Sequence, residues 1–168
     1  QQFRVAGMEA FEAGDDQLAV KNLQNYLISH RDDTEALYRY AIVRERVPLK
    51  RNQHVSRAMG ALQRVVELDP DHPSARLKLL KLYERYRLAT EALKLTEEVL
   101  KKRPDDAEVL RMRTWALMVV MRHEDALKTV RQALEQQPRD LKNRFLELEL
   151  MRSAGHSDRQ IAETVRQN

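Results

Sequence analysis

The sequence has no cysteine, and its 168 residues include only four glycines and five prolines. Aromatic residues make up 5% of the chain. The absence of cysteine excludes disulfides, thiol catalysis and thiolate metal sites, but it fits a reducing or an oxidising compartment equally well. With 42% hydrophobic and 33% charged residues, the scarcity of glycine, proline and aromatics disfavours collagen-like, proline-rich and β-rich folds and favours an all-α fold.

Long apolar runs are also missing. The longest covers residues 115–121, whereas a membrane-spanning helix needs about 20 apolar residues. No basic stretch followed by an apolar one precedes the first predicted helix. We therefore expect a soluble segment without membrane insertion. Because the chain starts at Gln1 and enters a helical pattern at once, we expect a piece of a longer protein whose targeting signal lies outside it, and the localisation stays unknown.

Charge of one sign is not concentrated anywhere. The 30 lysines and arginines and 26 acidic residues give a formal net charge of +4, and the two signs are interspersed. A nucleic-acid groove would be strongly positive. Nucleic acid is therefore a disfavoured partner, although basic residues on an outer face leave it as an alternative.

What the sequence does contain is a repeat of 34 residues, and such a period is the signature of stacked structural units. Prolines recur 34 residues apart at Pro70, Pro104 and Pro138, and an alanine lies 12 residues before each, at Ala58, Ala92 and Ala126. Ala19 precedes Ala58 by 39 residues, which predicts a five-residue insertion around Pro48 to Asn52. A weaker fifth unit starts at Leu141, with Gln160 in the alanine position.

Apolar spacings of three and four predict two helices in each unit. We expect first helices over residues 3–13, 34–46, 74–86, 107–121 and 141–154, and second helices over 16–29, 55–68, 89–102, 124–136 and 158–166. An alanine at the crossing of paired helices allows their backbones to approach closely, and each proline ends a unit. We expect the acidic residues after the prolines to cap the next helix, namely Asp71, Asp105, Asp106 and Asp140, and Ser157 with Gln160 to form a capping box.

No catalytic or metal-binding pattern is found. Five histidines are scattered over separate turns and helix ends, so none has a partner at metal-ligand spacing. The glycines are too far apart for a phosphate-binding loop, and no nucleophile elbow is present. Adjacent carboxylates such as Glu97 and Glu98 point in different directions on a helix. We therefore expect a protein that is not an enzyme and has no cofactor or metal.

The repeat resembles the tetratricopeptide repeat, a helix-turn-helix unit that stacks into a superhelix. Its small first-helix residue appears here as Gly7 and Ala41, and its turn glycine as Gly14 and Gly155. Later units depart from the pattern, with Leu80, Thr114 and Leu148 in the small position. The resemblance implies an all-α, right-handed α-solenoid of about five repeats in one domain, residues 1–168. The repeats would cover residues 1–33, 34–72 with the insertion, 73–106, 107–140 and a partial 141–168.

The resemblance also implies a non-catalytic scaffold that binds a partner peptide or helix on a concave face lined by the first helices. Spacings of three and four put the candidate residues on one stripe of each helix. The candidate binding residues are Arg4, Met8, Tyr38, Ile42, Arg46, Lys81, Arg85, Arg111, Trp115, Met118, Phe145 and Arg152. The alternative is a structural or oligomerisation module that self-associates end to end through Phe3, Phe11 or the last helix.

Two features each have two interpretations. Trp115 and Met118, with Tyr38 and Phe145, would form an anchor pocket, since aromatic residues and methionine are enriched in interfaces; alternatively, a helix covered on both sides needs more apolar residues. The insertion adds Lys50 and Arg51 to Arg44, Arg46 and Arg57. It would either contact an acidic partner or form a solvated loop.

Overall fold

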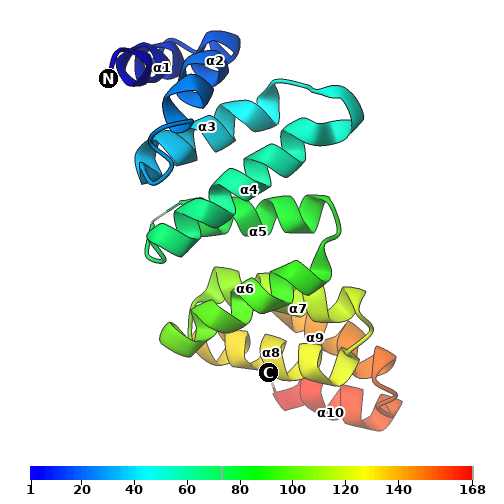
Figure 1. The fold of residues 1–168 in the computed structure, drawn as a ribbon. Coiled ribbons are helices and arrows are strands. Elements are labelled where there is room, and N and C mark those ends of the chain that lie inside the picture. Colours follow the sequence, from blue (N-terminus) through cyan, green and yellow to red (C-terminus); the bar gives the residue numbers. More distant parts are fainter. Residues whose placement is uncertain (73, 168) are drawn as a thin grey trace. The chain divides into compact units, whose positions relative to one another are not determined.

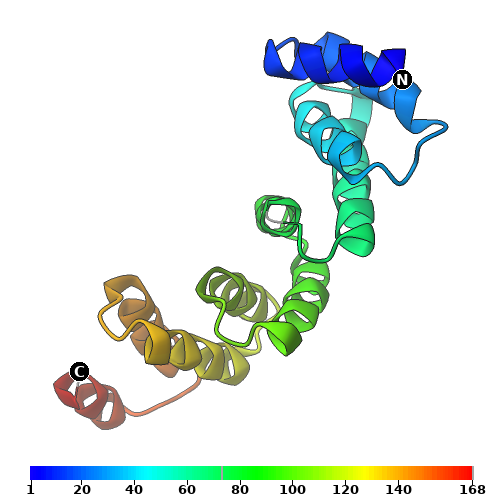
Figure 2. The same cartoon turned by 90° about the vertical axis from the view of Figure 1, so that its left-hand side faces the viewer.

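The computed structural model describes residues 1–72 and 74–167, the last by its backbone, and these form ten α-helices, one short 3-10 helix and no strand (Figures 1 and 2). The expected repeat limits at residues 73 and 168 lie outside the described residues. The helices are α1 (Gln2–Glu12), α2 (Asp16–Leu27), α3 (Thr34–Arg46), η1 (Lys50–Asn52), α4 (Gln53–Leu68), α5 (Ala75–Arg85), α6 (Ala89–Lys102), α7 (Ala107–Val119), α8 (His123–Gln136), α9 (Leu141–Ser153) and α10 (Asp158–Gln167).

Each predicted helix is present, and its ends agree with the prediction to within two residues. The largest difference at the end of a first helix is in α7, which ends at Val119 rather than Met121. Met121 has a φ of 59°, and a residue in this left-handed conformation cannot continue a helix. The prediction followed the apolar run, which continues through the turn.

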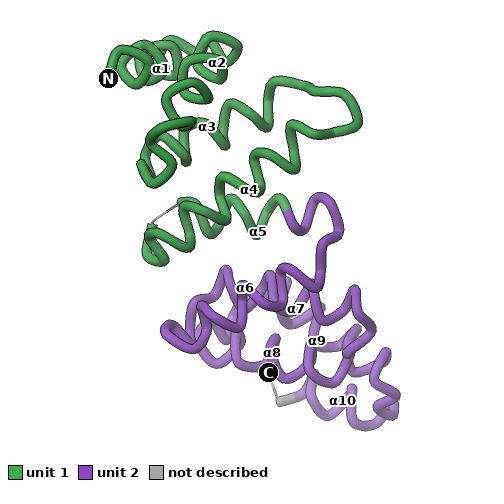
Figure 3. Tube along the Cα trace, in the orientation of Figure 1, with its two compact units in different colours: residues 1–82 green, residues 83–168 purple. Residues whose placement is uncertain are grey.

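The chain divides into two compact units, residues Gln1–Leu82 and Tyr83–Asn168, with the boundary inside α5 (Figure 3). In unit 1, α1 packs on α2, α2 on α3, and α3 on α4. In unit 2, each of α6 to α9 packs on the next helix. A core cluster in unit 2 joins α7 to α10 through Leu117, Leu127, Val130, Leu150 and Ile161. Antiparallel helix pairs are therefore the building blocks of both units.

The first hairpin has a close contact between its two helices. A Cβ added to Gly7 would lie 2.8 Å from Leu23 Cγ, so glycine is required opposite this leucine. In the repeat period, the same two positions hold Ala41 and Leu62 in unit 1 and Thr114 and Val130 in unit 2. These four residues are buried, as are Leu80 and Thr96 at the corresponding positions.

The alanines predicted from the repeat period lie in the core of the hairpins. Ala19, Ala58, Ala92 and Ala126 are fully buried on the second helices. In the fifth hairpin, Gln160 is exposed and the neighbouring Ile161 is buried instead. Because a larger side chain at a close helix crossing costs about 1–3 kcal/mol, these alanines explain how hairpins of 34 residues nest in register.

Carboxylates cap the helices at one recurring position. Asp33, Asp106 and Asp140 each accept a hydrogen bond from a backbone N–H in the first turn of α3, α7 and α9, and Asp15 does the same for α2. These bonds satisfy N–H groups that have no partner within the helix. Asp106 and Asp140 confirm the prediction. In the capping box of α10, the N–H of Ser157 donates to Gln160 Oε1 at 2.9 Å.

The prediction for Asp71 is wrong. At the start of α5, the N–H groups of Ser74 and Ala75 donate to Nδ1 of His72, at 3.4 and 3.2 Å. Measured in the repeat period, His72 occupies the position of Asp33, Asp106 and Asp140, whereas Asp71 corresponds to Asp32 and Asp105. An imidazole nitrogen without a proton is an acceptor, so the cap is retained with a different residue.

The turn between paired helices has a common backbone conformation. Gly14, Arg87, Met121 and Gly155 all have a positive φ. In the fourth turn, the N–H of Arg122 donates to the carbonyl of Leu117 and the N–H of Met121 to that of Met118. The same two bonds recur in the other three turns, and together they form a Schellman motif. Arg87 and Met121 adopt this conformation without being glycine, which costs roughly 1 kcal/mol each.

The insertion replaces this turn in the second hairpin. Residues 47–49 are extended or irregular, η1 follows, and Arg51 and Asn52 both have a positive φ. The expectation that Arg44 joins a basic surface there is wrong. Arg44 is 3% exposed, and its Nη2 donates to the carbonyl of Val47. A buried guanidinium at the end of α3 satisfies a carbonyl that the helix leaves without a partner.

Asp33 joins three helices of unit 1. Its Oδ2 accepts from Arg4 Nε of α1 at 2.8 Å and from the Tyr26 hydroxyl of α2 at 3.0 Å, while Oδ1 caps α3. Burial alone would raise the pKa of Asp33, but the hydrogen bonds from Arg4, the Ala36 N–H and Tyr26 outweigh it and lower the pKa below 3.8. Burial and the bond to Asp33 raise the pKa of Tyr26.

Three glycine-to-alanine substitutions should have three different effects on stability. Gly60 lies exposed inside α4, so Gly60→Ala should stabilise by about 0.5–1 kcal/mol. Gly155 has a φ of 84° and open space around it, so Gly155→Ala should destabilise by about 1 kcal/mol through the backbone alone. Gly7→Ala would contact Leu23 and should cost about 1–3 kcal/mol. Urea unfolding measures all three, and equal effects at positions 60 and 155 would contradict the left-handed turn.

Asp33→Asn should destabilise the chain at pH 7 by about 1–2 kcal/mol, because it removes the charge-assisted bond to Arg4. Since the folded-state pKa of Asp33 is lowered, its contribution is present above pH 4 and is lost as the pH falls through that pKa. The difference between wild type and variant should therefore shrink in unfolding experiments below about pH 4. Asp32→Asn is the control, because its pair with Arg64 is exposed and should contribute less than about 0.5 kcal/mol.

Candidate protein-binding surfaces

Ion pairs connect successive first helices. Arg39 of α3 lies 2.7 Å from Glu12 of α1, and its guanidinium stands over the ring of Phe11. Lys78 of α5 lies 2.5 Å from Glu45 of α3. In unit 2, Arg111 of α7 lies 3.4 Å from Glu84 of α5. These contacts hold neighbouring first helices together, so part of the charge on this surface is already paired within the chain.

The predicted binding residues of unit 1 differ in how far they are available. Arg4 is paired with Asp33, and Met8 and Ile42 are half-buried. Tyr38 is half-buried as well, and its ring lies 4.7 Å from that of His72. Exposed positions on the same stripe are Arg46, which lies 3.4 Å from Asp16, and Lys81. The two exposed cations remain the more accessible candidates in this unit.

In unit 2, Phe145 is the most exposed aromatic side chain of the described residues, at 62%. Trp115 and Met118 are half-buried, and Met118 packs against the core cluster. Arg85 and Arg152 are exposed. Arg111 donates hydrogen bonds to Glu108 and Glu84, and its hydrogen bond to Glu108 is the main cause that raises its pKa. Tyr38 belongs to unit 1 and the other three residues to unit 2, so the anchor pocket of Trp115, Met118, Tyr38 and Phe145 stays a prediction.

The repeat period indicates how Phe145 and Met118 relate. They occupy the positions that Arg111 and Glu84 occupy one repeat earlier, and those two side chains form an ion pair. One repeat further along, an aromatic ring and a thioether therefore replace a cation and a carboxylate. Two apolar residues therefore occupy the positions of a polar pair, and one of them, Phe145, is exposed.

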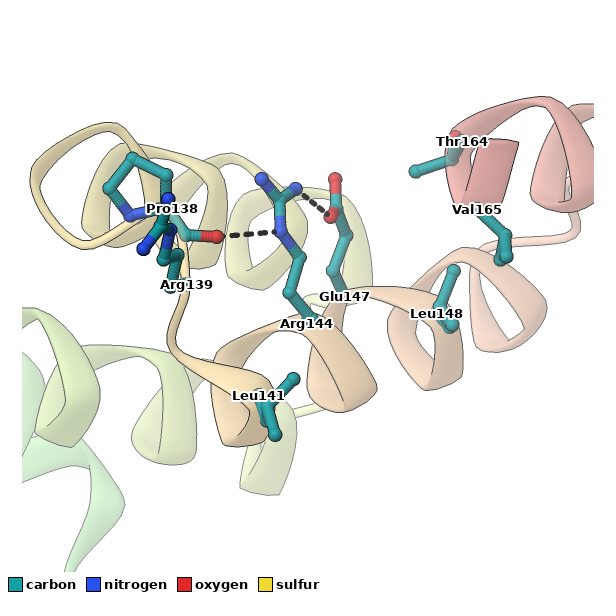
Figure 4. Close-up of a pocket in the computed structure, with 8 residues that line it drawn as sticks. All are labelled: Pro138, Arg139, Leu141, Arg144, Glu147, Leu148, Thr164 and Val165. Atoms are coloured by element: carbon teal, nitrogen blue, oxygen red, sulfur yellow. Dashed lines mark hydrogen bonds and ion pairs between the residues drawn. The ribbon is translucent and has the colours of Figure 1, made fainter. Parts of the chain in front are cut away.

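A separate groove lies at the fifth hairpin, between the turn before α9, the first half of α9 and the end of α10 (Figure 4). Its volume is about 490 Å³, within the range of ligand pockets. Leu141, Leu148 and Val165 supply its apolar surface, and Arg139 and Arg144 lie at its polar side. Leu141 is 82% and Val165 56% exposed, so these side chains leave apolar area in contact with water.

A buried carboxylate forms one wall of this groove. Glu147 is buried, and its two oxygens lie 2.8 Å from Arg131 Nε and 3.2 Å from Arg144 Nη1. Arg144 also donates to the carbonyl of Pro138, at 3.2 Å (Figure 4). The network ties α8, the turn and α9 together. Because a buried carboxylate needs paired partners, it fixes the position of Arg144 at the edge of the groove.

This groove was not predicted from the sequence. Its signal lies in departures from the repeat period: Arg144 and Glu147 stand where α3 has the buried Leu37 and Tyr40. These departures become visible only when every position, and not just the small residues and prolines, is compared between repeats. The fifth unit is thus the one that differs most.

The described part of the chain has neither a cluster of metal-ligating side chains nor a membrane-spanning helix. Over residues 1–72 and 74–167, no group of three or more metal-ligating side chains is brought together. None of the helices formed by these residues is both long enough and apolar enough to span a lipid bilayer.

The profile of the tetratricopeptide repeat family matches residues 51–116. This segment of the chain is therefore similar to the tetratricopeptide repeat. The matched segment covers α4, α5, α6 and most of α7, and with them two of the alanines and both intervening prolines that define the period. No curated protein matches the sequence significantly.

Solved structures of MamA share the fold. MamA from Desulfovibrio magneticus RS-1, residues 41 to the end, is 20% identical over 99% of this chain and 90% of its own, with a TM-score of 0.69. MamA AMB-1 is 18% identical over 99% and 89%, with a TM-score of 0.73. Another MamA crystal structure is 13% identical over 98% and 86%, with a TM-score of 0.75. These likenesses confirm the all-α solenoid fold of helix-turn-helix repeats.

Glu147→Gln should destabilise unit 2 by about 1–3 kcal/mol, because Arg144 and Arg131 lose a charged acceptor and a buried position loses its pairing. Thermal or urea unfolding measures the loss. Glu163→Gln is the matched control on α10. Its pair with Arg159 is exposed and should contribute less than about 0.5 kcal/mol. Equal losses for the two variants would show that Glu147 has no special role.

Proposed function

We propose that this chain is a non-catalytic scaffold that binds a protein or peptide partner on the face formed by its first helices, with residues 1–168 acting as a single interaction domain. The general part of this function follows from the repeat family, whose members serve as protein-interaction scaffolds. The specific part is where the partner binds. It rests on the apolar group formed by Trp115, Met118 and Phe145 on the first helices of unit 2.

The exposed ring of Phe145 is the observation that carries the proposal. Single exposed apolar residues are common on protein surfaces, but Phe145 and Met118 occupy the repeat positions of the paired Arg111 and Glu84. The cation Arg152 is exposed on the same helix as Phe145. Aromatic residues, methionine and arginine are the types enriched in protein interfaces. A partner side chain that covers the ring would remove it from water without disturbing the core beneath.

Self-association is a second candidate function, and exposed apolar residues at the other end of the chain favour it. Phe3 and Val5 of α1 and Leu18 of α2 are each about half exposed in the first hairpin. A second copy could cover them. Sedimentation equilibrium distinguishes the two functions, since a chain that remains monomeric at high micromolar concentration does not assemble through these residues.

A photo-crosslinking amino acid tests the location of the partner. We expect crosslinks from positions 145 and 115, and none from position 63, an exposed residue of the second helix α4. With the captured partner in purified form, Phe145→Ser should weaken binding at least tenfold, or about 1.4 kcal/mol. Leu18→Ser is the control, because it removes an exposed apolar residue from a second helix.

Folding of each variant is checked by circular dichroism. Unchanged affinity in a folded Phe145→Ser variant, or crosslinks from position 63 alone, would place the partner elsewhere. Retention of oligonucleotides at low salt would instead support the nucleic-acid alternative.

A further inference from the structure

The fifth hairpin, which contains the groove, differs from the earlier hairpins at several repeat positions. Four buried residues near the ends of the earlier second helices are apolar: Tyr26, Val65, Val99 and Ala133. The fifth residue in this series is Gln167. In sequence, the fifth hairpin therefore lacks the apolar residue that the other four share.

Apolar residues appear instead on the rim of the groove. Val165 occupies the position at which the other second helices have an exposed or polar residue: Gln24, Gln63, Glu97 and Arg131. Leu141 corresponds to Thr34 and Ala107, which are both less exposed than Leu141. Water contact of two such side chains is unfavourable by about 25 cal/mol for each Å² of apolar area. The rim is thus suited to an apolar side chain from outside.

The charge of the groove is reversed relative to the other repeats. Arg139 stands where the earlier turns have Asp32, Asp71 and Asp105. Asp32, the first of these aspartates, lies 2.6 Å from Arg64 of α4. The residue that corresponds to Arg64 in α10 is Arg166. Arginines therefore occupy, in the fifth hairpin and the turn before it, the two positions at which Asp32 and Arg64 form an ion pair.

Arg139 and Arg166 form no ion pair or hydrogen bond with the described residues. Arg144, on the same groove, shares the single carboxylate of Glu147 with Arg131. Two arginines, Arg139 and Arg144, thus line an apolar groove, and the carboxylate of Glu147, which lines it with them, is already bonded. Like charges in this arrangement favour an external carboxylate.

We propose that this groove is a protein-binding site in addition to the first-helix face of the proposed function, and that it takes an acidic amphipathic helix of another protein. A leucine-sized side chain of that helix inserts between Leu141, Leu148 and Val165. An aspartate or glutamate beside it pairs with Arg139. The partner thereby supplies both groups that this repeat has lost, the apolar residue and the turn carboxylate.

A set of three synthetic peptides tests the proposal. The first is a fluorescein-labelled 16-residue helix with leucines at spacings of three and four and with glutamate and aspartate on both flanks. In the second, every carboxylate is replaced by its amide, and in the third, every leucine is replaced by serine. Fluorescence anisotropy with the full chain should show binding of the first peptide and at least tenfold weaker binding of the other two. Sodium chloride should weaken the binding of the first peptide.

Two matched variants locate the site. Arg139→Asp restores the residue type of the other turns and should weaken binding of the acidic peptide at least tenfold, whereas Arg159→Asp, also an exposed arginine of unit 2, should change it less than twofold. Leu141→Ser tests the apolar part, and its exposure makes misfolding of the variant avoidable. Methyl NMR shifts should be confined to Leu141, Leu148 and Val165.

The remaining outcomes overturn the proposal. They are equal binding of the acidic and amide peptides, no binding of the acidic peptide at millimolar concentration, or equal effects of the two arginine variants. Self-association that is abolished by Arg139→Asp in sedimentation experiments would make a second copy the occupant and would also overturn it. Crosslinking from position 115 of α7 tests the first-helix face without involving the lining of the groove, so the failure of this proposal and the failure of the proposed function can be distinguished.

Discussion

The close crossing of two helices is the constraint on which the structure depends. In the first hairpin Gly7 lies against Leu23, and even a methyl group at position 7 would be too close. The second helices keep a fully buried alanine at Ala19, Ala58, Ala92 and Ala126. Small residues at such positions allow the paired helices to approach closely, and the hairpins keep the same period because these positions recur in step.

The turns and the helix caps stabilise the hairpins but do not by themselves determine the fold. The Schellman turns and the carboxylate caps recur in step with the helices, but each tolerates replacement: arginine or methionine for glycine at the turn, and histidine for aspartate at one cap. Such substitutions cost or contribute about a kilocalorie each. A core position has no comparable tolerance. The sequence signal of the family is therefore strongest at the crossings and weakest on the surfaces, where function resides.

The helices could be predicted because their apolar spacing and the alanines are set by this packing. Ala58, Ala92 and Ala126 are fully buried, as the 34-residue period indicated. Side-chain pairing could not be predicted in the same way. Asp71 and His72 are both plausible caps in sequence, and only the register of α5 decides between them. The sequence suggests that Arg44 is a surface cation, but its guanidinium donates to the carbonyl of Val47. This contact could not be predicted, because the insertion has no counterpart in the other repeats.

The contact of Gly7 with Leu23 also limits which parts of the array can be exchanged by protein engineering. Any residue larger than glycine at position 7 would come too close to Leu23. Replacing α1 alone by α3 would put Ala41 at this position, whereas replacing α1 and α2 together keeps two helices that already fit each other. The exchangeable module of the first hairpin is therefore the helix pair and not the single helix.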